Sequence, residues 1–119
     1  MSDLSIVIPC YNETKNLLRL FNKINLLIEE NQEIELIIVD NGSNDNSRTF
    51  IENHNLYKNN KIKLVKIDKN IGYGHGIMQG IYKSTGKVVS WCHADLQTDL
   101  RDTYEAYLNN KIQLLEKNI

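Results

Sequence analysis

Apolar residues are arranged in two different patterns, and the two patterns alternate along the whole chain. Short, nearly continuous apolar runs predict strands at 4–8, 34–39, 62–67 and 88–91. Apolar residues at every third or fourth position predict helices at 13–28, 47–55, 77–84 and 101–116. Strand and helix therefore alternate from the first element to the last.

An alternating order of strands and helices predicts an α/β fold. Each right-handed crossover through a helix brings the chain back parallel to the preceding strand. We therefore expect a three-layer, Rossmann-like, mostly parallel sheet with helices on both faces. The chain has 119 residues and contains no linker-like segment, so residues 1–119 are predicted to form a single domain.

Polar, glycine-bearing segments follow the predicted strands. The carboxyl ends of parallel strands meet at one edge of a sheet, and sheets of this kind bind ligands at that edge. The segments that we expect there are 9–12, 40–46, 68–76 and 93–99. The sequence therefore predicts one ligand site made from four separate parts of the chain.

Composition and charge exclude several classes of protein. The net charge is −1 and charges of both signs are interspersed, whereas a nucleic-acid partner normally requires a basic face. No apolar run approaches the roughly 18 residues of a membrane span, and the first run is too short for a signal peptide. The two cysteines, Cys10 and Cys92, do not make a disulfide framework. We therefore expect a cytoplasmic protein that binds no nucleic acid.

Metal-capable side chains stand at alternate positions after the last predicted strand. His93, Asp95 and Gln97 project from one face if the strand continues through them. A set of this size without a thiol is typical of Mg²⁺ or Mn²⁺ that is bound mostly by a substrate diphosphate. Imidazole is a poorer ligand for Mg²⁺, so His93 either favours Mn²⁺ or does not bind the ion. A strand end capped by Asp95 without any metal is the simpler alternative.

Two further segments have both a binding and a structural interpretation. Asp40 follows the second predicted strand and could accept hydrogen bonds from a ribose or a base, or could only close a turn. The glycine-rich run 70–76 is not a G-x-G-x-x-G fingerprint after the first strand, so it does not indicate a dinucleotide cofactor. Its backbone amides could still hold a phosphate at the start of a helix.

Four segments, taken together and in this order, resemble the family 2 glycosyltransferases with the GT-A nucleotide-sugar fold, including members similar to dolichyl-phosphate-sugar synthases. The segments are Ser5–Glu13, Ile38–Ser43, Asn70–Gly74 with Gly80 and Gly86, and His93–Gln97. The resemblance covers essentially the whole chain. The order and spacing of the four segments together are specific to this family, although no single segment is specific by itself.

The resemblance implies a donor site for a nucleoside diphosphate sugar. The first loop packs around base and ribose, the segment after the second strand hydrogen-bonds the base, and Asn41 here replaces the second acid of that pair. His93-Ala94-Asp95 matches the D-x-D metal motif with its first aspartate replaced. The implied nucleotide-binding residues are Pro9, Tyr11, Asn12, Glu13, Asp40, Asn41, Gly72, Gly76 and Asp95. The implied ligands of Mn²⁺ or Mg²⁺ are Asp95, Gln97 and His93.

The implied reaction is an inverting, metal-dependent transfer of a sugar to an acceptor, for which a lipid phosphate or a glycan is a candidate. Members of the family are usually much longer, and the segment beyond the metal motif supplies the acceptor pocket and the general base. We therefore expect this chain to be the donor-binding half, with the general base outside it and little turnover alone. A longer parent protein would act at the cytoplasmic face of a membrane.

Two other functions remain open on the sequence. A non-catalytic α/β module could bind an ion through Asp40 and Asp95. A degenerate glycosyltransferase half could instead serve as a dimerising scaffold, because Tyr104, Tyr107 and Leu115 form one stripe of the last predicted helix. A homodimer is therefore a further expectation.

Overall fold

The computed structural model describes residues 3–94 and 100–117, with side chains described as far as residue 110. The described strands form one parallel sheet in the order β3-β2-β1-β4. The strands are β1 (Leu4–Cys10), β2 (Ile34–Asn41), β3 (Lys63–Ile67) and β4 (Val88–Trp91). The helices are α1 (Thr14–Glu30), α2 (Ser47–Asn53), α3 (Asn55–Lys58), α4 (Tyr73–Lys83) and α5 (Leu100–Lys117).

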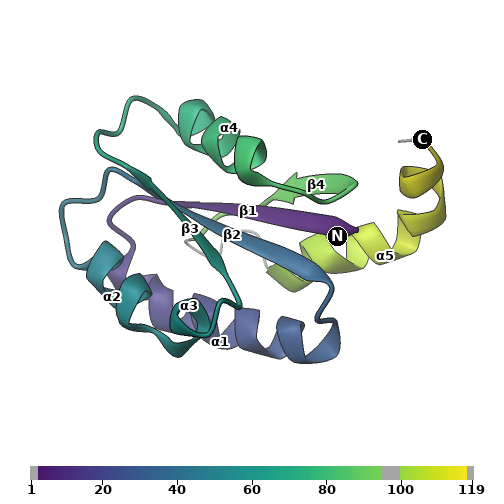
Figure 1. Cartoon of the computed structure of the whole chain (residues 1–119), viewed down its shortest axis with the longest axis horizontal. Helices are drawn as coiled ribbons and strands as arrows, with labels where there is room; N and C mark the ends of the chain where they lie inside the picture. The colour runs from purple at the N-terminus through teal and green to yellow at the C-terminus, as the bar shows by residue number, and fades with distance from the viewer. Residues whose placement is uncertain (1–2, 95–99, 118–119) are drawn as a thin grey trace.

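Helices cover both faces of the sheet, which confirms the predicted three-layer α/β fold. The helix α4 lies on one face, and α1, α2, α3 and α5 lie on the other (Figure 1). Alternate residues of β1 point to opposite faces, so Ile6 and Ile8 enter the larger core while Val7 packs beneath α4. Both faces of β1 and β2 are buried, as is usual for parallel strands.

The first strand is longer than the predicted range of 4–8, which placed Pro9 in the loop that follows it. β1 continues to Cys10, with Pro9 opposite Val39. The carbonyl of Val7 accepts a hydrogen bond from the N–H of Cys92 (3.1 Å), so the backbone of Val7 faces β4. Pro9 faces the same side two residues later, beyond the end of β4. Its missing N–H therefore removes no hydrogen bond from the sheet.

Two predicted helix boundaries are also wrong. The glycine-rich run predicted as a loop is mostly helical, because α4 begins at Tyr73 rather than at residue 77. The helix predicted at 47–55 is divided at His54 into α2 and α3. The His54 ring accepts a hydrogen bond from the N–H of Leu56 at Nδ1 (3.1 Å) and so caps the start of α3.

The predicted self-association surface on the last helix comprises Tyr104, Tyr107 and Leu115, and the two of these residues whose side chains are described are not exposed. Tyr104 and Tyr107 are buried in the larger core, and the hydroxyl of Tyr104 accepts a hydrogen bond from Asn31 (3.2 Å). Arg101 also pairs with Glu30, which fastens α5 to the end of α1. The side chain of Leu115 lies outside the described residues. The two described residues of the stripe that suggested a homodimer therefore pack within one chain.

A single carboxylate joins the strands at the amino-terminal edge of the sheet. Glu35 of β2 accepts hydrogen bonds from the Ser5 hydroxyl (2.7 Å) and from both the N–H and the hydroxyl of Thr85 (2.8 and 3.0 Å). It also pairs with Lys63 of β3. Its side chain is only 8% exposed. Glu35 thus connects β1, β2, β3 and the segment that leads into β4.

Replacing Glu35 with glutamine is expected to lower the free energy of unfolding at pH 7 by about 2 kcal/mol. Burial raises the pKa of this carboxyl, but the hydrogen bonds from Lys63, Ser5 and Thr85 outweigh it and lower the pKa to about 2. Because the pKa is lower in the folded state, the stabilisation is complete above the unfolded value of 4.5 and is lost as the pH falls from there towards 2.

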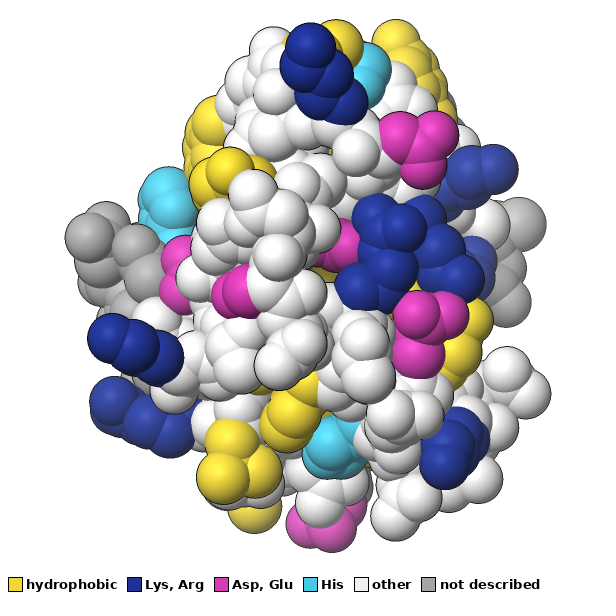
Figure 2. All heavy atoms as spheres, turned by 90° about the vertical axis from the view of Figure 1, so that its left-hand side faces the viewer, with side chains coloured by type: hydrophobic (Ala, Val, Ile, Leu, Met, Phe, Trp, Pro, Cys, Tyr) yellow, Lys and Arg dark blue, Asp and Glu magenta, His cyan; other side chains and the backbone are white. Residues whose placement is uncertain are grey.

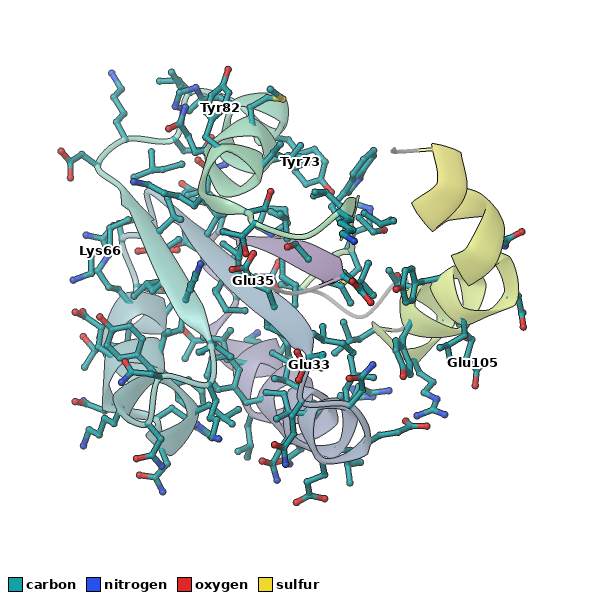
Figure 3. All side chains as sticks on the ribbon, turned by 45° about the vertical axis from the view of Figure 1, so that its right-hand side comes forward. Glu33, Glu35, Lys66, Tyr73, Tyr82 and Glu105 are labelled. Atoms are coloured by element: carbon teal, nitrogen blue, oxygen red, sulfur yellow. The ribbon has the colours of Figure 1, made fainter. Side chains whose placement is uncertain are left out.

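Urea unfolding between pH 7 and pH 2.5 measures this effect. The matched control is Glu33→Gln, two residues earlier, where the side chain is exposed (Figure 3). The control should leave both the stability and its pH dependence nearly unchanged. Equal losses in the two variants would show that the hydrogen-bonded carboxylate contributes nothing of its own.

Candidate functional site

The strand order of the sheet reverses at β1. The chain proceeds from β1 to β2 and β3 on one side, and then crosses to place β4 on the other side of β1. Open α/β sheets bind ligands at the carboxyl ends of the strands beside such a reversal. Figure 2 looks onto this edge, where backbone and side chains that are neither charged nor hydrophobic make up most of the surface between the acidic and basic side chains.

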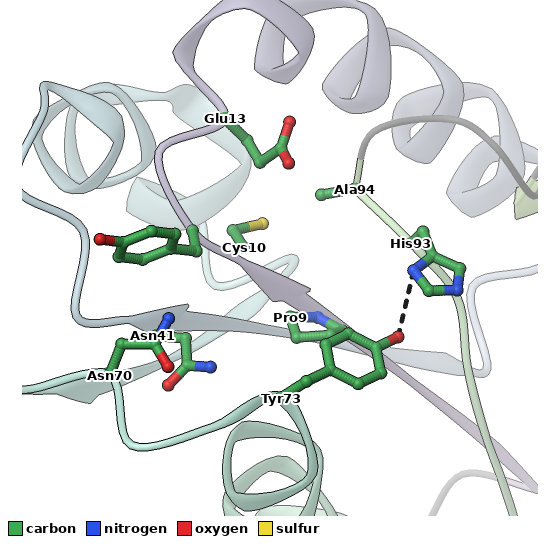
Figure 4. A pocket seen from close by; sticks show the side chains of 9 residues that line it. Pro9, Cys10, Glu13, Asn41, Asn70, Tyr73, His93 and Ala94 are labelled. Carbon is green, nitrogen blue, oxygen red and sulfur yellow. Dashed lines mark hydrogen bonds between the residues drawn. The ribbon is translucent and has the colours of Figure 1, made fainter.

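A pocket of about 400 Å³ lies at this edge (Figure 4). It is lined by Pro9, Cys10, Tyr11, Glu13, Asn41, Asn70, Tyr73, His93 and Ala94. These residues come from the ends of β1, β2 and β4 and from the segment that leads into α4. The structure therefore brings together parts of all four segments that the sequence placed at one edge.

Five of the residues predicted to bind nucleotide or metal line the pocket directly. They are Pro9, Tyr11, Glu13, Asn41 and His93. Asn12 is placed differently, in the left-handed conformation (φ 52°). Its N–H donates to the Ser43 hydroxyl and its Oδ1 accepts from the N–H of Asn44, both at 3.0 Å. Asn12 thus joins the first loop to the second beside the pocket.

Asp40 is engaged inside the protein rather than at the pocket wall. Its side chain is fully buried and pairs with the guanidinium of Arg48. The other carboxylate oxygen accepts the N–H of Ser43 (3.2 Å), and Arg48 also donates to the carbonyl of Ile67 (3.0 Å). Both carboxylate oxygens of Asp40 are therefore occupied by contacts within the protein. These contacts agree with the interpretation that Asp40 closes a turn.

Asn41 is held in one orientation by the glycine-rich segment. Its side-chain nitrogen donates to the carbonyl of Gly72 (3.2 Å), and a Cβ on Gly76 would lie 2.7 Å from the same nitrogen. Gly72 and Gly76 therefore contact Asn41, and neither lines the pocket. Asn41 is 3% exposed, and its Oδ1 has no hydrogen-bond partner among the described residues. A buried oxygen without a partner is costly and calls for a donor.

Gly42 brings the segment before α4 against the end of β2. It adopts φ +75°, and a Cβ at this position would lie 2.4 Å from the backbone nitrogen of Asn70. Asn70 in turn accepts the N–H of Gly72 at its Oδ1 (2.9 Å). Glycine is required at position 42 both for this conformation and for the close approach.

The predicted metal ligands are only partly described. His93 lines the pocket, whereas Asp95 and Gln97 lie outside the described residues. Within residues 3–94 and 100–117, no three His, Cys, Asp or Glu side chains form a group that could hold a metal ion. The described part of the pocket offers one of the predicted metal ligands, the imidazole of His93. Such a sparse set fits a divalent cation that takes most of its ligands from substrate phosphates.

The sequence did not single out every residue that lines the pocket. Asn70 and Tyr73 belong to the glycine-rich segment, but they were not distinguished from the glycines beside them. Cys10 forms part of the lining, and burial, followed by the nearby carboxylates of Glu13 and Asp40, raises the pKa of its thiol far above the usual range. Burial therefore disfavours the thiolate form of Cys10, as expected of a small buried residue.

Comparison of the sequence with known proteins gives two findings. Residues 5–108 match the sequence profile of glycosyl transferase family 2. Undecaprenyl-phosphate 4-deoxy-4-formamido-L-arabinose transferase of Proteus mirabilis (strain HI4320) is 36% identical over 98 residues. The match covers 82% of this chain and 30% of that protein, so the chain spans less than a third of the length of its relative.

Comparison of the structure with solved structures finds the same fold. S. aureus TarS 1-349 in complex with UDP-GlcNAc matches with a TM-score of 0.69 and 23% identity, over 93% of this chain and 32% of that one. The mannosyltransferase PcManGT of Pyrobaculum calidifontis, in complex with GDP-Man and Mn²⁺, matches with a TM-score of 0.73 and 21% identity, over 86% and 30% of the two chains. At sequence identities this low, the structural similarity establishes the shared fold alone.

Proposed function

The chain belongs to glycosyl transferase family 2, and from this we propose that it forms the part of a glycosyltransferase that binds a nucleoside diphosphate sugar. The observation that carries the proposal is the pocket at the strand-order reversal, where Pro9, Tyr11, Glu13 and Asn41 meet His93. Its volume of about 400 Å³ lies in the range of small-molecule sites. The fold is also that of proteins solved with UDP-GlcNAc and GDP-Man.

The residues of the pocket divide into groups suited to different parts of the donor. Tyr11 is partly exposed and offers a ring face on which a base can stack. The unpartnered Oδ1 of Asn41 can accept a hydrogen bond from a base N–H. Pro9 and Glu13 complete the wall next to Tyr11. We assign the base and ribose to this side of the pocket.

The diphosphate is assigned to the other side, at the end of β4. Asp95, Gln97 and His93 would hold Mn²⁺ or Mg²⁺ there together with the phosphate oxygens. When bound, the cation offsets the negative charge that develops on the leaving diphosphate. The general base that deprotonates the acceptor is assigned to a part of the enzyme outside this chain.

A lipid phosphate is the acceptor class that we propose for the whole enzyme. The support is the name of the Proteus relative, which specifies undecaprenyl phosphate. Among the described residues, no helix combines the length and the apolar character needed to cross a bilayer. We propose that the whole enzyme meets its acceptor at the cytoplasmic face of a membrane.

Calorimetry of the 119-residue chain with UDP and GDP, each with and without Mn²⁺, tests the proposal. We expect at least one nucleotide to bind when Mn²⁺ is present and to bind more weakly without it. Circular dichroism on the same sample establishes that the chain is folded. A folded chain that binds neither nucleotide would contradict the proposal. Tight binding of Mn²⁺ alone would instead favour the ion-binding module.

A further inference from the structure

Two pocket residues from separate elements form a stacked, hydrogen-bonded pair. Tyr73 is the first residue of α4, and His93 follows β4 twenty positions later. The Tyr73 hydroxyl lies 3.1 Å from Nδ1 of His93 (Figure 4). The ring centroids are 5.4 Å apart and the ring planes differ by only 10°. Both rings line the pocket.

Packing in the core does not account for this pair. Other aromatic contacts, such as Phe21 with Phe50, lie in or against the larger core. Tyr73 is 45% exposed, so the stack with His93 buries little apolar surface. An aromatic pair adds only about 1 kcal/mol beyond the area that it buries. What the pair does achieve is to fix the orientation of one imidazole at the pocket wall.

We propose that Tyr73 is a positioning residue, which holds His93 so that Nε2 is the nitrogen available to a divalent cation. The proposal rests on the proposed function, because the cation accompanies the donor nucleotide. Histidines that bind metals usually donate the other ring N–H to an oxygen, and this bond fixes the tautomer. The proposal assigns this role to the Tyr73 hydroxyl, which lies 3.1 Å from Nδ1, with His93 as the donor. With Nδ1–H donated to it, Nε2 keeps its lone pair for the cation.

Selectivity between cations follows from this arrangement. Mg²⁺ prefers oxygen ligands, whereas Mn²⁺ accepts imidazole nitrogen more readily. A histidine fixed at the first position of the 93–95 motif therefore favours Mn²⁺. Without the Tyr73 hydroxyl, the imidazole is free to rotate and to change tautomer, and the advantage of Mn²⁺ should shrink.

The tautomer of His93 can be measured without metal or nucleotide. Nitrogen NMR of the ¹⁵N-histidine-labelled chain reports which ring nitrogen carries the proton, and His54→Asn and His75→Asn variants assign the signals. We expect the Nδ1–H form to predominate at His93 in the native chain and to be lost in Tyr73→Phe. A native chain with the proton on Nε2 would overturn the proposal. This measurement stands even if the chain binds no nucleotide.

Calorimetry with the nucleotide that binds the chain then measures cation selectivity. We expect Tyr73→Phe to weaken Mn²⁺-supported binding about 10-fold and to leave Mg²⁺-supported binding unchanged. The matched control is Tyr82→Phe, on the same helix but 70% exposed and outside the pocket lining. His93→Asp should reverse the preference towards Mg²⁺. An equal Mn²⁺-to-Mg²⁺ ratio in the native chain, Tyr73→Phe and His93→Asp would also overturn the proposal.

Discussion

Replacing Asp95 with alanine is expected to abolish Mn²⁺-dependent binding of the nucleoside diphosphate, with a loss of affinity of about 100-fold or more. Even the partners that orient a metal ligand contribute about 10-fold to 100-fold to affinity, so loss of the single carboxylate proposed in the set should cost at least as much. Ala94, the residue before Asp95, lines the pocket. Calorimetry with UDP or GDP in the presence of Mn²⁺ measures the loss.

Two further variants serve as controls for the effect of Asp95→Ala on nucleotide binding. Asp102→Ala removes the same charge from the exposed first turn of α5 and should bind nucleotide normally. Asn41→Ala removes one hydrogen-bond acceptor and is expected to weaken binding only about 5-fold, since one such bond contributes about 1 kcal/mol. If Asp95→Ala binds as well as Asp102→Ala, then Asp95 is not a ligand of the cation.

Replacing Gly80 with alanine is expected to lower the free energy of unfolding by about 2 to 3 kcal/mol, as overfilling a packed core does. A Cβ at this position would lie 2.3 Å from Cγ1 of Val7 and 2.9 Å from Cγ2 of Val39. The alanine therefore forces α4 away from the face of the sheet that it covers. Because Tyr73 begins this helix, the same displacement should also weaken nucleotide binding.

Gly74 offers the same substitution on the same helix without the obstruction. A Cβ on Gly74 meets nothing within 4 Å, and alanine reduces the flexibility of the unfolded chain. Gly74→Ala should therefore be neutral or raise the stability by up to about 1 kcal/mol. Urea unfolding of both variants measures the contrast. Similar stabilities for Gly80→Ala and Gly74→Ala would show that close packing of α4 is unimportant.

A double variant identifies the contact that makes Gly80 necessary. Val7→Ala removes both side-chain methyl groups that a Cβ on Gly80 would meet on β1. Combining it with Gly80→Ala should therefore cost less than the two separate losses added together. Strict additivity would mean that the strain in Gly80→Ala arises elsewhere, for instance against Val39.

Several features of the site could not be predicted because they depend on contacts between distant segments. A proline such as Pro9 usually indicates the end of a strand. Pro9 can lie within β1 because the neighbouring strand β4 ends before it. The sequence leaves two interpretations of Asp40 open, a group that binds a ligand or a group that closes a turn, and its ion pair with Arg48 of α2 depends on the tertiary structure. Nothing local to Tyr73 or His93 indicates that these two rings stack.

The sequence by itself determined the order of strands and helices, the parallel sheet and the edge at which its polar segments gather. Periodic burial and right-handed crossovers dictate these features, and both act locally along the chain. Only the tertiary structure decided which polar groups at that edge face the pocket. Asp40 and Asn41 are neighbours in sequence, yet the first pairs with Arg48 while the second lines the pocket. The partners of a side chain depend on which distant residues the fold brings within contact distance. The spacing of residues along the sequence does not predict those contacts.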